Sequence, residues 1–417
     1  MPIEKCYDFV TYCRFRMNRR TSKRTLSTCC GVHVLHDGLV DMLYALLPIL
    51  REAFGLSYTE VALIRSANKA ATAIFQIPAG VLAERIGERS LLTLGTVAAG
   101  LAFIGLGFST GFVSVLIFIF LAGVGAAVQH PLASSLITGA YPGAGRRAAL
   151  GTYNSFGDVG KFLFMGLTIL ATGMSIPWQT PVVGYGVIAL VIAAVSFLLL
   201  YRAGAGGRPT PHPTADARNG SGGWGVRHRR GFLSLGMIAA LDNSTRTGFL
   251  TFVAFLMIEK GVPTEWSASA VLITLLGGML GKFACGMLAE RIGITRTIAI
   301  TEIFTGGGIL VILVLPPLYA FFLLPLLGVF LNGTSSAIYG SVSDLIDDDR
   351  HSRAFGLMYT LGSVCGLIAP LAFGLLADSA GVAATMAAVA LLVLLTLPFC
   401  LVLGPALHTV GSPRPAE

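Results

Sequence analysis

The sequence predicts an all-α membrane protein, with twelve transmembrane helices in two pseudo-symmetric six-helix halves. Composition is the first observation: 54% of the 417 residues are hydrophobic and 12% are charged, and the mean hydropathy is +0.76. Soluble globular domains are much less apolar. The second observation is that GVLAERIG at residues 80–87 recurs as GMLAERIG at residues 286–293. A repeat about half a chain apart indicates two related halves.

Apolar runs of about 20 residues, long enough to cross about 30 Å of hydrocarbon, recur along the whole chain. We expect spans at 29–53, 58–83, 90–108, 112–140, 149–173, 180–202, 232–258, 265–289, 295–314, 317–343, 353–377 and 381–406. The chain then divides into a basic N-terminal tail (1–28), an N-terminal half (29–202), a linker (203–231), a C-terminal half (232–406) and a C-terminal tail (407–417). The linker is rich in Gly, Pro and Arg and poor in apolar residues, which is typical of a flexible connection.

Positive residues predict the orientation of the spans. They gather in the N-terminal tail, the linker, both repeated loops and the turn with Arg146 and Arg147, whereas 108–113 and 174–181 carry no charge. This asymmetry predicts an inner (plasma) membrane protein with both termini in the cytoplasm. Topology therefore explains the net charge of +8, and no nucleic-acid partner is expected. The N-terminal tail is too basic, and the run after it too long, for a cleaved signal peptide.

The expected first span carries four titratable residues on one face. At about 100° per residue they occupy an arc of about 140°; they are His33, His36, Asp37 and Asp41. The second span carries a polar stripe formed by Arg65, Asn68, Lys69, Thr72 and Gln76. Packed ion pairs between helices would explain this stripe. A water-filled path explains it better, because Arg65 and Lys69 repel each other at i, i+4 spacing unless solvent or an anion neutralises them.

Later spans carry further charged and polar residues. The fourth span has Gln129, His130 and Pro131, the fifth Asn154, Asp158 and Lys161, the seventh Asp242 and Arg246, and the eighth Lys282. The spacings of Asp158 with Lys161 and of Asp242 with Arg246 also permit simple intrahelical salt bridges. Lys282 has no acidic neighbour on its own span, so its partner is expected from another helix. Five basic residues, four acidic residues and three histidines make a slightly basic, titratable core, which suits an anionic or zwitterionic solute and proton coupling.

These residues divide into two groups of candidates. The expected substrate-binding residues are Arg246, Lys282, Lys69, Arg65, Gln76, His130, Asn154, Asn332 and Tyr359. The expected proton-coupling residues are Asp37 or Asp41 with His33 or His36, followed by Asp158 and Asp242. Cys29 and Cys30 with His33 and His36 could be proposed as a metal site, but paired Cys-x-x-Cys motifs are missing and no metal is expected. The absence of a phosphate-binding loop favours a proton gradient over ATP, and no cofactor is expected.

The repeated loops carry a resemblance. The segment Gly80-x-Leu82-Ala83-Glu84-Arg85-x-Gly87-x-Arg89 and its copy Gly286-x-Leu288-Ala289-Glu290-Arg291-x-Gly293 resemble the signature loop of the major facilitator superfamily. The resemblance covers essentially all of 29–406 and implies the major facilitator fold. It also implies a gating role for Gly80, Glu84, Arg85, Gly87, Arg89, Gly286, Glu290, Arg291 and Gly293, whose glycines permit tight turns and whose charges form pairs that break when the halves rock.

Within the superfamily, His33-x-x-His36-Asp37, Leu46-Leu47-Pro48 and His130-Pro131 resemble the fosmidomycin-resistance branch of exporters. Two features depart from known patterns. The fourth span lacks the arginine of many proton-coupled members, and GTYNSFGDVGKF in the fifth only loosely resembles the antiporter glycine motif.

The expected function is that of a proton-coupled secondary transporter of a small organic anion or anionic drug-like compound. We expect alternating access, export by antiport and a monomer. One alternative is a proton symporter that imports a carboxylate or phosphonate-like solute, and another is a transporter-like sensor or assembly scaffold. The intact repeated loops argue against the scaffold, since a scaffold needs no gate. An enzyme is not expected, because the chain has no nucleophile motif.

Overall fold

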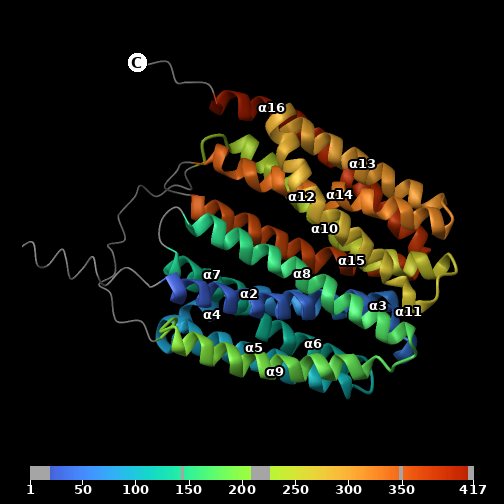
Figure 1. The fold of residues 1–417 in the computed structure, drawn as a ribbon. Helices are drawn as coiled ribbons and strands as arrows, with labels where there is room; N and C mark the ends of the chain where they lie inside the picture. Colours follow the sequence, from blue (N-terminus) through green and yellow to red (C-terminus); the bar gives the residue numbers. More distant parts are fainter. Residues whose placement is uncertain (1–18, 142–144, 208–225, 347–350, 412–417) are drawn as a thin grey trace, which may run out of the picture.

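The computed structural model describes residues 19–141, 145–207, 226–346 and 351–411, and the regular elements in this part are all helical. Figure 1 shows two groups of helices, one coloured blue to green and the other yellow to red. The first group contains α2 (Arg19–Asp41), α3 (Leu43–Phe54), α4 (Tyr58–Ile86), α5 (Glu88–Gly107), α6 (Phe112–Ala127), α7 (Gln129–Ala140), α8 (Gly145–Gly173) and α9 (Gln179–Arg202). The second contains α10 (Arg229–Glu259), α11 (Thr264–Ser267), α12 (Ser269–Ile292), α13 (Ile294–Val314), α14 (Pro317–Val342), the 3₁₀ turn η1 (Ser343–Leu345), α15 (His351–Leu394) and α16 (Thr396–Gly411). The all-α prediction is confirmed.

The helices are consistent with the expected twelve spans. In the described part of the chain, nine stretches are long and apolar enough to cross a membrane. One of them, Thr360–Leu407, is about 70 Å of helix at 1.5 Å per residue, too long for one crossing. The chain reverses inside it at Gly381, where φ is 86°. The charge-bearing helices α4 and α10, with 29 and 31 residues, are long enough to supply the remaining two spans.

Four of the expected spans are interrupted helices, and in the N-terminal half these are the first and the fourth. The first begins at Arg19, inside the expected tail, and is interrupted at Met42, where the Ala45 amide donates to the Met42 carbonyl in a tighter turn. The fourth is interrupted at Val128. Pro131 explains the second break, because a proline ring clashes with the carbonyl four residues earlier, here that of Ala127. Sequence periodicity predicted both spans as continuous, since apolar residues continue through each break.

Glycines bring helices into close contact around the core. A Cβ atom on Gly160 of α8 would lie 2.0 Å from the Val34 carbonyl oxygen of α2, and a Cβ on Gly157 would lie 2.6 Å from His33 Nε2. Neither position tolerates a side chain without displacement of α2. Small residues at such contacts allow helix backbones to approach closely in lipid. The pairing of α2 with α8 sets the distance between the charged residues that these two helices carry.

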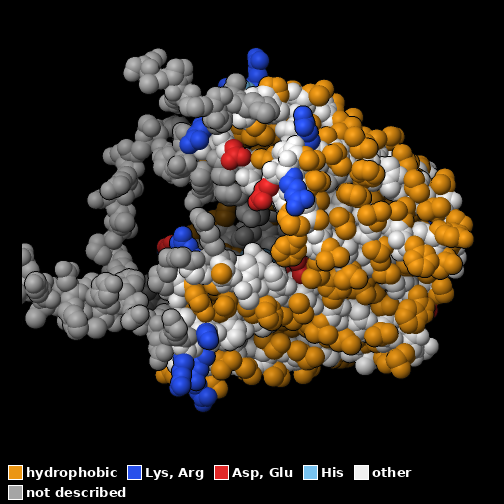
Figure 2. Space-filling view, turned by 45° about the horizontal axis from the view of Figure 1, so that its top comes forward, with side chains coloured by type: hydrophobic (Ala, Val, Ile, Leu, Met, Phe, Trp, Pro, Cys, Tyr) orange, Lys and Arg blue, Asp and Glu red, His pale blue; other side chains and the backbone are white. Residues whose placement is uncertain are grey.

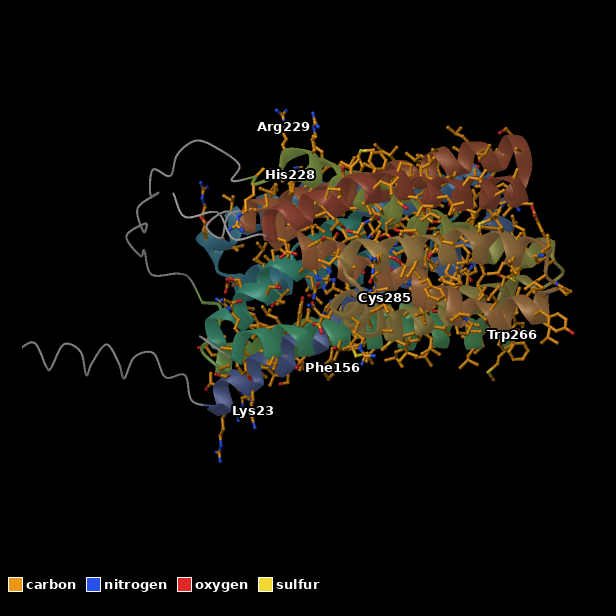
Figure 3. The ribbon with its side chains drawn as sticks, turned by 90° about the horizontal axis from the view of Figure 1, so that it is seen from above. Lys23, Phe156, His228, Arg229, Trp266 and Cys285 are labelled. Atoms are coloured by element: carbon orange, nitrogen blue, oxygen red, sulfur yellow. The ribbon has the colours of Figure 1, made fainter. Side chains whose placement is uncertain are left out.

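The two halves meet at one end of the molecule, which we call the far end; the linker leaves from the opposite, linker end. At the far end, Asp378 of α15 accepts hydrogen bonds from the Tyr58 and Thr59 amides of α4, at 2.8 and 2.9 Å, and the Trp266 ring covers Gly173. Figure 3 shows Trp266 at this end and Lys23, His228 and Arg229 toward the linker end. Figure 2 shows a hollow between the halves at the linker end. The halves are therefore closed at the far end and separated at the linker end.

Candidate functional site

Lys161 lies at the centre of a network of ion pairs between α2 and α8. Its Nζ is 3.3 Å from Asp158 Oδ1, 3.5 Å from Asp41 Oδ2 and 3.6 Å from Asp37 Oδ2. Asp158 precedes Lys161 by three residues on α8, and Asp37 and Asp41 are one turn apart on α2, so helix geometry places all three carboxylates around one ammonium group. The intrahelical pair of Asp158 and Lys161 thus exists, as part of this larger network.

Lys282 extends the network to the other half. Its Nζ is 2.9 Å from Asp158 Oδ2 and 3.2 Å from Oδ1. The expectation that the partner of Lys282 comes from another helix is confirmed. This ion pair joins α12 of the C-terminal half to α8 of the N-terminal half. The distance between Lys282 and Asp158 therefore depends on the relative position of the two halves.

Two histidines lie against Asp37. Nε2 of His33 is 3.3 Å and Nε2 of His130 is 3.5 Å from Asp37 Oδ1, while Nδ1 of His33 is 2.7 Å from the Tyr153 carbonyl oxygen. His36 is turned elsewhere: its Nε2 is 3.1 Å from Thr96 Oγ1 on α5. The structure therefore brings His33 and His130 into the network and leaves His36 out of it. His36 lies at the edge of the expected face, where Thr96 of α5 supplies its hydrogen-bond partner.

His33, Asp37 and His130 also form the group that could hold a metal ion, with ligand atoms within 4.8 Å of one another. Two imidazoles and a carboxylate are a common donor set for divalent transition metals. The Lys161 ammonium on the other oxygen of Asp37 opposes a dication there. The four-residue site considered from the sequence is not assembled, because Cys29 and Cys30 are buried in an apolar cluster. The charge balance of the group suits protons better than a metal.

Arg65 is engaged within its own half. It is 2% exposed, its Nη2 donates to the Tyr44 hydroxyl at 2.9 Å, and its guanidinium lies 4.2 Å over the Tyr44 ring. Nη2 is also 3.6 Å from Asp41 Oδ1. Arg65 thus supports the turn between α2 and α3 in this conformation. Lys69, one turn further along α4, is half-buried and interacts electrostatically with Asp41 and Lys161.

The C-terminal half contains a second charged group, formed by Asp242, Arg246 and Glu302. Asp242 is 4% exposed and Glu302 is 1% exposed, and Arg246 is half-buried. Neither carboxylate oxygen of Glu302 has a hydrogen-bond partner, and Asp242 and Arg246 act on it electrostatically. Sequence reasoning missed Glu302. The available signal was a lone acidic residue inside the apolar run 295–314, since such residues are rare within membrane spans and mark functional positions.

The remaining substrate candidates are more scattered. Gln76 and Asn154 are exposed, whereas Asn332 is 7% exposed and its amide nitrogen lies 3.4 Å from the Gly328 carbonyl of its own helix. The Cβ position of Gly278 is 2.5 Å from that amide nitrogen, so Asn332 fills a contact between α12 and α14. The side chain of Tyr359 lies outside the described residues.

The two signature loops share one geometry. Gly87 and Gly293 end α4 and α12 with φ of 89° and 91°, a conformation that favours glycine. In the first loop the Arg89 amide donates to the Gly206 carbonyl at 2.9 Å, and the Arg89 guanidinium lies 5.0 Å over the Tyr201 ring. This loop therefore attaches to the end of α9 in its own half. The other candidate gating residues lie beside these turns; Glu84, Arg85, Glu290 and Arg291 are exposed, and Gly80 and Gly286 have open space at their Cβ positions.

The sequence matches the Major Facilitator Superfamily over residues 29–325 and 266–416. The chain belongs to this superfamily. Its relatives include the uncharacterized MFS-type transporter YfnC of Bacillus subtilis (strain 168), 26% identical over 86% of this chain and 88% of that protein. The probable sulfoacetate transporter SauU of Cupriavidus necator is 25% identical over 80% of this chain and 82% of that protein. A bacterial homolog of the human lysosomal transporter Spinster, solved in an inward-facing conformation, shares the fold at a TM-score of 0.80 and 15% identity, over 95% of this chain and 100% of the other. The chain is a multi-pass membrane transporter of the major facilitator superfamily.

Proposed function

We propose that this transporter moves a small organic anion by alternating access coupled to protons. In this proposal it acts as a monomer in the inner membrane, with the linker end in the cytoplasm. The observation that carries the proposal is the network around Lys161, in which carboxylates and histidines share basic partners and one ion pair crosses between the halves. Rocking of the halves would change that ion pair, and protonation of an acid would free a basic group.

The anion is assigned to the basic residues that border both halves. Arg246 offers a planar fork that matches two oxygens of a carboxylate or sulfonate, whereas Lys282 and Lys69 act as point charges. The relative SauU, named for sulfoacetate, supports a small anion with such groups. Arg65 contributes through its charge, because its hydrogen bonds to Tyr44 and Val40 occupy it in this conformation.

The coupling proton is assigned to Asp37 or Asp41. Both acids pair with the Lys161 ammonium, so one positive charge is shared between the two carboxylates. His33 and His130 lie on Asp37 and provide a second place for a proton. Protonation of Asp37 or Asp41 would remove one negative charge from the surroundings of Lys161. Lys161 would then bind its remaining carboxylate partners more strongly.

For direction we propose export by proton antiport, with the resemblance to fosmidomycin-resistance exporters as support. Symport is the second candidate and is favoured by Arg246, which interacts electrostatically with the acids Asp242 and Glu302. If those acids compete with the substrate for Arg246, protonation of the acids favours anion binding. Anion and proton would then be carried together.

The test uses purified protein with sulfoacetate and a panel of small carboxylates, sulfonates and phosphonates in a thermal-shift screen at two pH values. We expect stabilisation by an anion in the wild type and its loss in Arg246→Ala. Arg296→Ala, at an exposed arginine of α13, is the control and should keep binding. Unchanged anion affinity in Arg246→Ala would refute the assignment. Uptake of the hit into proteoliposomes under an imposed pH gradient then decides direction: accumulation on the alkaline side indicates symport, and accumulation on the acidic side indicates antiport.

A further inference from the structure

The C-terminal half holds buried polar atoms that the proposed proton antiport does not use. Both carboxylate oxygens of Glu302 lack hydrogen-bond partners, and so do the hydroxyls of Thr305, one turn along α13, and Thr245, on α10. Thr301, beside Glu302, instead donates to the carbonyl oxygens of Thr297 and Ile298, as threonines in helices commonly do. Buried polar groups in proteins are almost always paired, so an unpaired cluster calls for an explanation.

The charges in this cluster do not balance when every group is ionised. The groups that act on Glu302 electrostatically are Asp242 and Arg246 of α10, and Glu302 acts in turn on Cys400 of α16. Of the other elements packed on α13, α14 carries no charged residue, and among the described side chains of α15 the charged one is Asp378, at the far end. On α12, Lys282 is paired with Asp158, and Glu290 and Arg291 are exposed at the loop. Two buried acids therefore face one arginine, an excess of one negative charge.

We propose that Asp242 and Glu302 form a proton-binding site in the C-terminal half, with Arg246 as their shared counter-ion. A single proton on the pair removes the excess charge. Within a low-dielectric interior this is far less costly than an unpaired carboxylate. A protonated carboxyl can also donate a hydrogen bond to a neighbouring buried oxygen, which an ionised carboxylate cannot do. Glu302 holds the proton in this conformation, because both of its carboxylate oxygens are fully buried without a hydrogen-bond partner and it is the more buried of the two acids.

Arg246 gives the site its link to the rest of the protein. Besides Asp242 and Glu302, its charge acts on Tyr44, the residue on which Arg65 is stacked in the N-terminal half. Within the described part of the chain, Arg246 makes no ion pair with either acid in this conformation. Loss of the proton would draw Arg246 toward the two ionised acids, and binding of the proton would release it. The site thus adds a second proton position to the proposed function, separate from Asp37 and Asp41.

Infrared difference spectroscopy of the purified full-length protein tests the site without a substrate. A protonated carboxyl gives a carbonyl-stretch band that moves in D₂O. We expect this band in the wild type near neutral pH, its loss in Glu302→Gln, and its retention in Glu265→Gln, the control at an exposed position of α11. In Asp242→Asn, Arg246 has only Glu302 to neutralise. Glu302 should then ionise, and the band should weaken although Glu302 is present.

Each result decides the proposal. Identical carboxyl bands in the wild type and Glu302→Gln would overturn it, as would an unchanged band in Asp242→Asn. If Glu302→Gln fails to fold, the Asp242→Asn comparison carries the test. Stabilisation of the wild type by NaCl over choline chloride, lost in Glu302→Gln, would assign the site to sodium and overturn the proton assignment. Since these readouts need neither transport nor an anion, they succeed or fail independently of the proposed function.

Discussion

Replacing Asp378 by alanine removes the hydrogen bonds that join α15 to the start of α4 at the far end. The carboxylate accepts from the Tyr58 and Thr59 amides at 2.8 and 2.9 Å and from Thr59 Oγ1 at 2.5 Å. These amides are among those that a helix leaves unpaired at its first turn, so Asp378 caps α4 from the opposite half. The bonds exist only while the far end is closed, and their loss therefore shifts the equilibrium toward the state that is open there.

The magnitude follows from the cost of losing a cap. Replacing a capping side chain by alanine costs about 0.5–2 kcal/mol. Because the cost falls on one of the two states, this loss of about 0.5–2 kcal/mol changes the ratio of far-end-open to far-end-closed molecules by about 2–30-fold. Asp378→Asn keeps an acceptor oxygen and loses the charge at the helix terminus, worth about 0.3–1 kcal/mol. We expect it to shift the ratio less than alanine does.

The measurement is the distance between spin labels at Thr110 and Tyr319, which lie at the far end of opposite halves, in a variant whose native cysteines are replaced. Ser57→Ala is the matched control. Ser57 Oγ accepts from the Glu60 amide at 3.1 Å and caps the same helix from within its own half. That variant should be less stable with an unchanged ratio, because the cap is present in both states. Equal distance distributions in Asp378→Ala and Ser57→Ala would show that the contact does not hold the far end closed.

Three further predictions concern the network and the loops. Gly157→Ala places a Cβ 2.6 Å from a ring nitrogen of the network and should lower stability by about 1–3 kcal/mol in thermal denaturation. Gly166→Ala on the same helix meets its nearest atom at 3.8 Å and should be tolerated; equal losses would disprove the packing argument. A double-mutant cycle of Asp158→Asn and Lys282→Met should show a coupling of about 0.2–1 kcal/mol in the ratio of the two states, and zero coupling would remove this pair from the switch. Glu84→Gln should slow turnover and leave substrate affinity largely unchanged, and normal turnover with unaltered cysteine labelling on both membrane sides would contradict a gating role.

Much of the fold and part of the site could be predicted because both depend on local spacing. The length of an apolar run predicts a span. The i, i+4 spacing of Asp37 and Asp41 places both on one side of a helix, whichever helices pack against it. The need of Lys282 for a partner followed from the cost of an isolated charge in a membrane. These inferences concern single helices, and the sequence determines them directly.

Contacts between distant segments could not be predicted in this way. Asp378 binds residues about 320 positions earlier in the chain, and no periodicity relates the two. His36 lay on the expected face, but its direction depends on Thr96 of a neighbouring helix. Glu302 was overlooked because a run that is apolar on average is still predicted as a span when it contains one acidic residue. Its importance comes from the lack of partners, which only the packed structure shows.

The interruption at Met42 divides the first span into α2 and α3, and these two sections have different neighbours. α2 packs within its own half, mainly against α8, whereas α3 touches α4 and α8 of its own half and also α10, α11 and α12 of the other half. Arg65 spans the break, since it donates to the Val40 carbonyl before it and to the Tyr44 hydroxyl after it. Bending at Met42 as the far end opens would pull on Arg65 and thereby on Asp41, the last residue of α2, while Asp37 keeps its place one turn away. Opening of the far end would in that case change the surroundings of Asp41 and leave those of Asp37 unchanged, so two acids one turn apart would respond differently to the same movement.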